Sequence, residues 1–139
     1  MTQNFYRHMI NNCMSNLKYE KYLKNSNSKG FIIVITYLPL RRRYTIQFLL
    51  LTRKIINKLM ISPVISFGLY ANFTRSYFVT VSVWESKDSM HDFVNTLPHS
   101  TAMKNFDKWK SNEGKFIQYQ SISLTIDWKK VQQELKIDI

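Results

Sequence analysis

The sequence predicts a single α+β domain in which the segments follow one another as strand, helix, strand, strand, helix, strand. Two observations indicate this order. The first is a pair of adjacent segments, residues 64–73 and 77–84, in which apolar and polar side chains alternate as in antiparallel strands. The second is a helical pattern on each side of this pair, with a further strand-like segment beyond each helix. The order is the ferredoxin-like βαββαβ pattern, with an antiparallel sheet and two layers.

The first thirty residues are expected to form an N-terminal helical extension and a linker. The segment 1–24 has the pattern of a weakly amphipathic helix. Its apolar side chains recur every three or four residues, at Phe5, Met9, Cys13 and Leu17. The segment 25–30, "NSNSKG", has the composition of a linker.

The ferredoxin-like domain is expected to span residues 31–126. Its first segment, "FIIVITYL" at 31–38, is rich in β-branched residues and is followed by Pro39, so it predicts a central strand. Residues 44–60 then show an apolar stripe at helical spacing. Pro63 ends this helix, because proline disfavours a helical conformation in the residue before it.

The two middle strands each have an apolar face and a mixed face. We expect Val79, Val81 and Val83 to meet the helices. The mixed face then combines small polar residues with an aromatic ring, as pocket linings do. Its residues are Ser66, Gly68, Tyr70, Asn72, Thr80 and Ser82. The alternative is an ordinary antiparallel sheet with one half-wet face.

Aromatic residues on the face opposite the valines predict that this face is covered. Phe78 and Trp84 alternate with the valines, and we expect Tyr70 on the same side as these two aromatic residues. Exposed apolar patches of this kind commonly mark an interface. We therefore expect a homodimer in which two sheets meet and enclose a barrel.

The second helical region is predicted in two pieces. Ser86 is a suitable N-cap for a helix over residues 87–95. Pro98 can occupy the first position of a second piece that runs to Lys110. "TLPHS" at 96–100 therefore marks a break between two helices.

The last segments predict a strand and a helical tail. Residues 115–126 have strand composition, and the alternation of apolar side chains slips between Tyr119 and Ile122, which predicts a bulge. Asp127 is expected to cap a short C-terminal helix within the tail 127–139.

Composition limits the classes of function. The net charge of +11 favours contact with anions, but no aromatic residues interleave the densest run, Arg41, Arg42 and Arg43. Nucleic-acid binding is therefore not the expected role. Cys13 is the single cysteine, so no disulfide can form within the chain, and a reducing cytoplasmic location fits. The apolar run 31–40 is far shorter than the roughly 20 residues of a membrane span, so no span is predicted.

The stretch 82–103, "SVWESKDSMHDFVNTLPHSTAM", resembles the dimeric α/β-barrel superfamily. It is most similar to the antibiotic-biosynthesis-monooxygenase group and to bacterial proteins like spheroidene monooxygenase. The likeness covers residues 31–120 and rests on four residues, Trp84, Glu85, Phe93 and His99. It implies a homodimer with one cavity per subunit, which oxygenates small organic molecules either without a cofactor or with haem.

The resemblance also suggests site residues. In the haem-degrading branch a helix histidine binds iron, and the matching position here is Met103. A pocket tryptophan of that branch matches Phe93. His99 lies one helical turn before Met103 and could face the same cavity, where it would bind iron if haem is present.

We therefore expect His99 to be the catalytic residue. A position in the first turn of a helix should lower its pKa, because the helix dipole is positive there. The expected ligand-binding residues are Tyr70, Thr80, Ser82, Trp84, Phe93 and Met103. The alternative for His99 is a solvated histidine at a helix kink, and the alternative for Trp84 is packing.

Two functions stay open at this point. The first is a monooxygenase-like protein that binds an apolar small molecule, or haem, in a barrel cavity. The second is a non-catalytic, ligand-binding or stress-related protein on the same fold, since fold alone does not decide function.

Overall fold

The computed structural model describes residues 16–139, and in this part of the chain five strands form one antiparallel sheet. The strand order is β1-β3-β4-β2-β5, so β4 is the central strand and β1 and β5 are the edges. The strands are β1 (Asn16–Tyr22), β2 (Phe31–Pro39), β3 (Ser66–Asn72), β4 (Tyr77–Trp84) and β5 (Lys115–Ser121). The predicted order βαββαβ is confirmed from β2 to β5.

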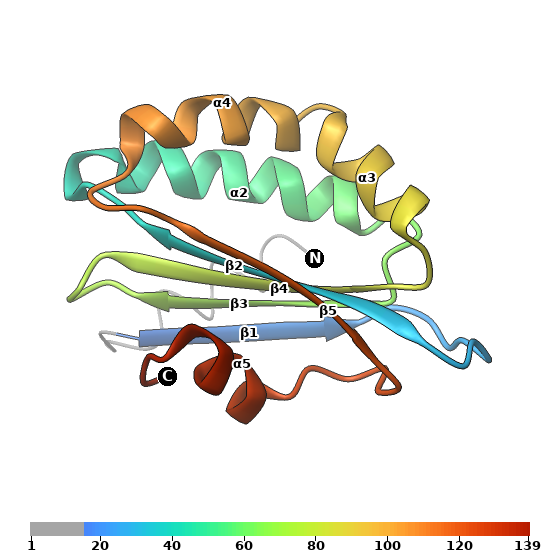
Figure 1. The fold of residues 1–139 in the computed structure, drawn as a ribbon. Helices are drawn as coiled ribbons and strands as arrows, with labels where there is room; N and C mark the ends of the chain where they lie inside the picture. The colour runs from blue at the N-terminus through green and yellow to red at the C-terminus, as the bar shows by residue number, and fades with distance from the viewer. Residues whose placement is uncertain (1–15) are drawn as a thin grey trace.

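Helices cover both faces of the sheet and make three layers (Figure 1). One face carries α2, α3 and α4, and the other carries α5. The helices are α2 (Thr45–Leu59), α3 (Lys87–Asn95), α4 (His99–Trp109) and α5 (Trp128–Leu135), with a 3-10 turn η1 (Arg42–Tyr44) before α2. Within the described residues, none of these helices is long and apolar enough to cross a membrane.

The helix predicted over residues 1–24 is wrong for residues 16–22, which form β1. This strand pairs with β3 along its whole length, from Asn16 opposite Asn72 to Tyr22 opposite Ser66. Leu17 and Tyr19 pack into the clusters under α2, while Lys18 and Glu20 point the other way. A two-residue period therefore decides the structure here. Residues 1–15 of the predicted helix, including Cys13, lie outside the described residues.

The predicted caps of α3 and α5 are confirmed. The side chain of Ser86 accepts a hydrogen bond from the backbone N–H of Ser89 at 3.2 Å. The carboxylate of Asp127 accepts hydrogen bonds from the backbone N–H groups of Lys129 and Lys130. Each cap satisfies N–H groups that have no partner inside the helix, which fixes where the helix begins.

The predicted bulge in the last strand is wrong. β5 pairs with β2 in unbroken register from Lys115 opposite Tyr37 to Ser121 opposite Phe31. The apolar alternation slips after Tyr119 because the chain leaves the sheet after Ser121 and crosses to α5.

The assignment of the valine face is also wrong. Val79, Val81 and Val83 pack against α5 rather than α2, α3 and α4, and Val131 and Leu135 of α5 are fully buried against them. Phe78 and Trp84, on the opposite face, lie under the other helices. The alternation identifies two faces correctly. It could not show which helices cover each face, because both faces are apolar enough to be buried.

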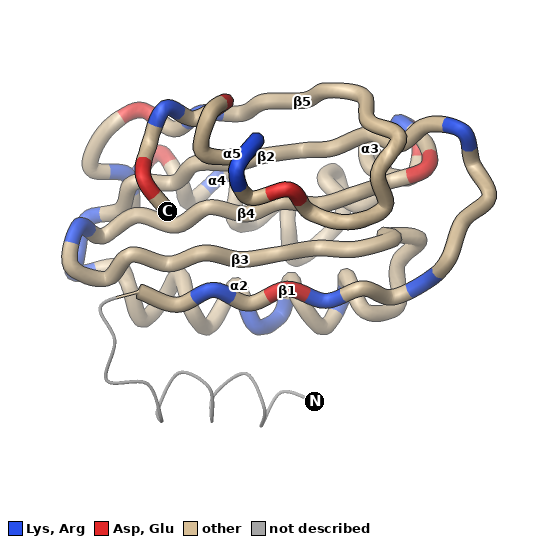
Figure 2. Tube along the Cα trace, turned by 90° about the horizontal axis from the view of Figure 1, so that it is seen from below, with Lys and Arg blue, Asp and Glu red and all other residues tan. Residues whose placement is uncertain are grey.

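The segment before α5 fits closely against β3. The hydroxyl of Ser66 donates a hydrogen bond to the carbonyl of Leu124 at 2.8 Å. A Cβ atom added at Gly68 would lie 2.8 Å from Cδ1 of Ile126 and 2.9 Å from Cζ2 of Trp128. The C-terminal segment therefore covers the sheet face that α2, α3 and α4 leave open (Figure 2).

Candidate functional site

Two hydroxyl side chains of the central strand remain partly accessible under the layer of α2, α3 and α4. They are Thr80 and Ser82 of β4. On the same face of this strand, the flanking Phe78 and Trp84 are fully buried. Solvent thus reaches the middle of the strand but neither end of it, although the whole face lies beneath helices.

The neighbouring strand β2 extends this accessible area. Thr36 lies opposite Thr80, and Val34 lies opposite Ser82, in the pairing of β2 with β4. Both side chains are partly accessible. We call these four residues the floor. The floor combines one apolar side chain with three hydroxyl side chains, and solvent reaches all four. Buried apolar groups lie at its ends. Such a mixture is also found in the linings of small-molecule sites.

Along β4, the floor lies between two apolar clusters. One cluster joins Phe48 of α2 and Trp109 of α4 to Phe78. The other joins Phe93 of α3 to Trp84. Ile56 of α2 and Tyr19 of β1 pack against both clusters, and Val34 of the floor packs against the second. The clusters therefore support the floor from both ends of β4.

A row of three rings leads from the floor to the start of α4. The indole N–H of Trp84 donates a hydrogen bond to the hydroxyl of Ser82 at 2.8 Å. The ring of Trp84 lies 5.4 Å from the ring of Phe93, measured between centroids. The ring of Phe93 lies 5.5 Å from the imidazole of His99. These distances are in the range of favourable aromatic contacts, so the row fixes the position of His99.

His99 is a half-buried imidazole with an unsatisfied nitrogen. Within the described residues, its Nδ1 is buried and has no hydrogen-bond partner. Burial lowers the pKa of His99, and the backbone carbonyl of Val94 opposes this shift only in part. The direction predicted from the sequence is confirmed, but its main cause is desolvation of the charged ring. At neutral pH the ring is uncharged and able to accept a proton.

Five of the seven predicted site residues come together on this face. They are Thr80, Ser82, Trp84, Phe93 and His99. Tyr70 is on the other face, where its ring packs 6.1 Å from that of Tyr77. This follows from the register, which places Tyr70 beside Val79. Met103 is 48% exposed on α4, outside the row of rings.

Sequence reasoning missed the contribution of β2 to the floor. Thr36 is the single residue with a small polar side chain in "FIIVITYL", which is the signal that could have found it. A hydroxyl in an otherwise apolar strand needs either a partner or solvent, and here solvent reaches it.

The residue at the matched iron-binding position, Met103, does not fit the haem site of the haem-degrading branch. The described residues contain no group of three metal-binding side chains. Nδ1 of His99 is buried, so only Nε2 of this ring could approach iron or a substrate. Met103, at the position that matches the iron-binding histidine of haem-degrading proteins, is half exposed.

Comparison with known proteins identifies the fold. No family model and no curated protein matches the sequence. Among solved structures, an antibiotic biosynthesis monooxygenase superposes with a TM-score of 0.59 at 14% identity, over 66% of this chain and 99% of its own. A conserved protein from Methanosarcina mazei gives 0.59 at 13% identity, over 66% and 92%.

A ferredoxin-fold protein from Listeria monocytogenes, described as related to antibiotic biosynthesis monooxygenases, is also similar. It gives a TM-score of 0.52 at 24% identity, over 73% of this chain and 62% of its own. Likenesses at these identities show a shared fold. The resemblance inferred from residues 82–103 is confirmed at that level.

Proposed function

We propose, from the fold that this chain shares with proteins related to antibiotic biosynthesis monooxygenases, that it binds an apolar small molecule on the floor and oxygenates it. The observation that carries the proposal is the accessibility of Thr80 and Ser82 in the middle of a helix-covered central strand. A layer built only for stability would fill this position with apolar side chains.

The chemistry assigned to the site needs few groups. Neutral His99 accepts a proton from an acidic CH₂ or phenol group of the substrate. The hydroxyls of Thr36, Thr80 and Ser82 orient the oxygen atom of the substrate by hydrogen bonds. The substrate itself supplies the four electrons that reduce O₂, so an activated CH₂ group and O₂ give a carbonyl group and water. This reaction requires no cofactor.

A non-catalytic ligand-binding role is the second candidate. It is favoured by the composition of the site, in which His99 is the only titratable side chain among the floor and the three rings. Within residues 16–139, no carboxylate contributes to the pKa shift of the imidazole, whereas many catalytic histidines are oriented by one.

The experiment compares the wild type with His99→Ala and Thr80→Leu, and uses His91→Ala as the matched control because His91 is exposed on α3. Each protein is titrated with 2-tetralone, farnesol and haemin. We expect His99→Ala and Thr80→Leu to weaken binding of 2-tetralone by about tenfold, equivalent to roughly 1.4 kcal/mol. The control should stay within twofold of the wild type.

Oxygen consumption separates the two candidates. Uptake of O₂ in the presence of 2-tetralone that is lost in His99→Ala supports the monooxygenase. Binding without uptake supports the non-catalytic role. Equal affinities of all four proteins for all three compounds would contradict both.

The homodimer and the cytoplasmic location stay predictions. A homodimer through the open sheet face would require α5 to leave its place, because Val131 and Leu135 are fully buried against that face. We therefore propose that any dimer of this chain forms through other surfaces, and no residue of the proposed site depends on it.

A further inference from the structure

Most of the net positive charge of the chain comes from one long segment, because this segment lacks acidic residues. Residues 21–84 contain ten lysines and arginines and no aspartate or glutamate. This segment includes the whole of α2, which forms one side of the helix layer (Figure 1). The charge of α2 therefore has no compensating acid within the helix or the strands beside it in sequence.

Large aliphatic side chains are exposed on the same helix. Ile46 is 66% exposed and Leu50 is 54% exposed, and Ile61, in the turn after the helix, is 80% exposed. The buried side chains Phe48 and Leu59 lie on the opposite side of α2. The exposed aliphatic residues thus form a stripe that points away from the sheet, because residues four apart share one side of a helix.

Cations border this stripe. Arg53, Lys54 and Lys58 are exposed and lie between or beside Leu50 and Ile61 along the helix. We call these three residues together with Ile46, Leu50 and Ile61 the outer face of α2. Its aliphatic residues are too exposed to stabilise the domain, and the helix is already anchored by its buried side.

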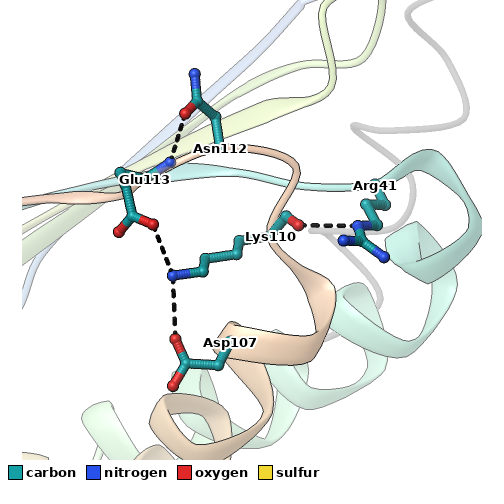
Figure 3. A network of polar contacts seen from close by, with 5 residues as sticks. All are labelled: Arg41, Asp107, Lys110, Asn112 and Glu113. Atoms are coloured by element: carbon teal, nitrogen blue, oxygen red, sulfur yellow. Dashed lines mark hydrogen bonds and ion pairs between the residues drawn. The ribbon is translucent and has the colours of Figure 1, made fainter.

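Acidic groups at the end of α4 do not cancel this charge. At the end of α4, Asp107 and Glu113 both contact the ammonium group of Lys110, at 3.2 and 2.9 Å (Figure 3). Arg41 donates a hydrogen bond to the backbone carbonyl of Lys110. Lys104 and Lys108 of α4 stay exposed. The helix layer is therefore basic at this end, while α3 at the other end carries the exposed Asp88 and Asp92.

We propose that the outer face of α2 docks the protein on an anionic lipid bilayer, with the helix lying parallel to the membrane. Ile46, Leu50 and Ile61 would enter the boundary between headgroups and acyl chains, while the cations contact lipid phosphates, as in interfacial amphipathic helices. A nucleic acid is the weaker partner, because base stacking needs aromatic side chains and the large exposed side chains beside these cations are aliphatic.

The probe is a vesicle of phosphatidylcholine with 30% phosphatidylserine, compared with phosphatidylcholine alone, in a co-sedimentation assay on the full chain at physiological salt. We expect binding to the anionic vesicles only. Replacing Arg53, Lys54 and Lys58 by glutamine should weaken it about 100-fold, since each cation near an anionic surface contributes about fivefold. Ile46→Ser with Leu50→Ser should weaken it about tenfold or more without any change of charge.

A matched control removes the same number of positive charges at positions outside the outer face of α2. Lys29, Lys129 and Lys136 are exposed and lie outside the outer face of α2, so their triple replacement by glutamine should reduce binding by far less than the α2 triple variant. Thermal unfolding of each variant verifies that the fold is kept, as expected for exposed positions.

Several results would overturn the proposal. They are no binding to anionic vesicles, equal losses in the two triple variants, or unchanged binding of the Ile46→Ser, Leu50→Ser variant. Tight binding of a 20-nucleotide RNA that the α2 triple variant alone loses, without vesicle binding, would assign the same face to nucleic acid instead. A loss of self-association in the serine variant, without vesicle binding, would assign it to a second copy of the chain.

Discussion

At the residue scale, His99 connects the packing of the helix layer with acid–base chemistry. Its ring is held by Phe93 on one side, and its Nδ1 is buried without a partner in the described structure. A buried donor or acceptor left without a partner is unfavourable by about 1–3 kcal/mol. Such groups are uncommon in folded proteins, so packing alone does not account for a histidine at this position.

The lowered pKa of His99 predicts a pH dependence of stability. The folded protein resists protonation of the ring, so as pH falls below the ordinary histidine pKa of about 6.5 the unfolded chain binds the proton first. Stability from this residue is complete above that pKa and is lost as pH falls toward the folded pKa. Urea unfolding between pH 5 and 8 should therefore show a slope in the wild type that His99→Gln reduces.

The control for this measurement is His91→Gln on α3, where the side chain is exposed. This variant should keep the slope of the wild type. If His99→Gln and the wild type lose stability in parallel as pH falls, the imidazole is not desolvated in the way the structure indicates.

At the element scale, the C-terminal segment acts as the third layer of the domain. Trp128 illustrates its attachment, since its indole N–H donates a hydrogen bond to Glu20 of β1 at 2.7 Å and its ring lies under the ammonium group of Lys18 at 5.0 Å. The carbonyl of Asp138 accepts a hydrogen bond from the hydroxyl of Tyr77 at 3.1 Å. The segment is therefore tied to both β1 and β4.

Replacing Gly68 by alanine tests this fit. The added methyl group would meet Ile126 and Trp128 at less than 3.0 Å, so the segment before α5 must shift. We expect a loss of about 1–3 kcal/mol in the free energy of unfolding, the usual cost of overpacking. Gly30→Ala is the control, because nothing lies within 4 Å of a Cβ at that position. Equal stabilities of the two variants in urea would show that α5 is not packed against β3.

The sequence predicts the elements better than their surroundings. Strong periodicity and caps at Ser86 and Asp127 place α3, α5 and the middle strands to within a residue or two. β1 was missed because it is an edge strand with charged residues at alternate positions, which leaves only Leu17 and Tyr19 to show the period. The face of β4 that meets each helix depends on α5, and no local pattern in β4 contains that information.

At the scale of the whole molecule, three layers place a basic helix on the outside and an accessible strip of hydroxyls inside. Trp84, Phe93 and His99, which the resemblance over residues 82–103 singled out, form one row of ring contacts in the structure. Tyr70 could not be placed correctly, because its side of the sheet is set by its register beside Val79. Thr36 needed the pairing of β2 with β4 before it could join the floor.

The central claim is that an apolar molecule binds on the floor between the two clusters, and the methyl resonances of threonine test it most directly. The ¹H–¹³C NMR spectrum of protein labelled at threonine methyl groups is followed during titration with 2-tetralone. Thr36 and Thr80 should shift together and saturate at the same ligand concentration, while Thr74, exposed in the turn after β3, and Thr125, exposed before α5, should not move. Shifts confined to Thr74 or Thr125, or a spectrum that 2-tetralone leaves unchanged, would contradict the claim.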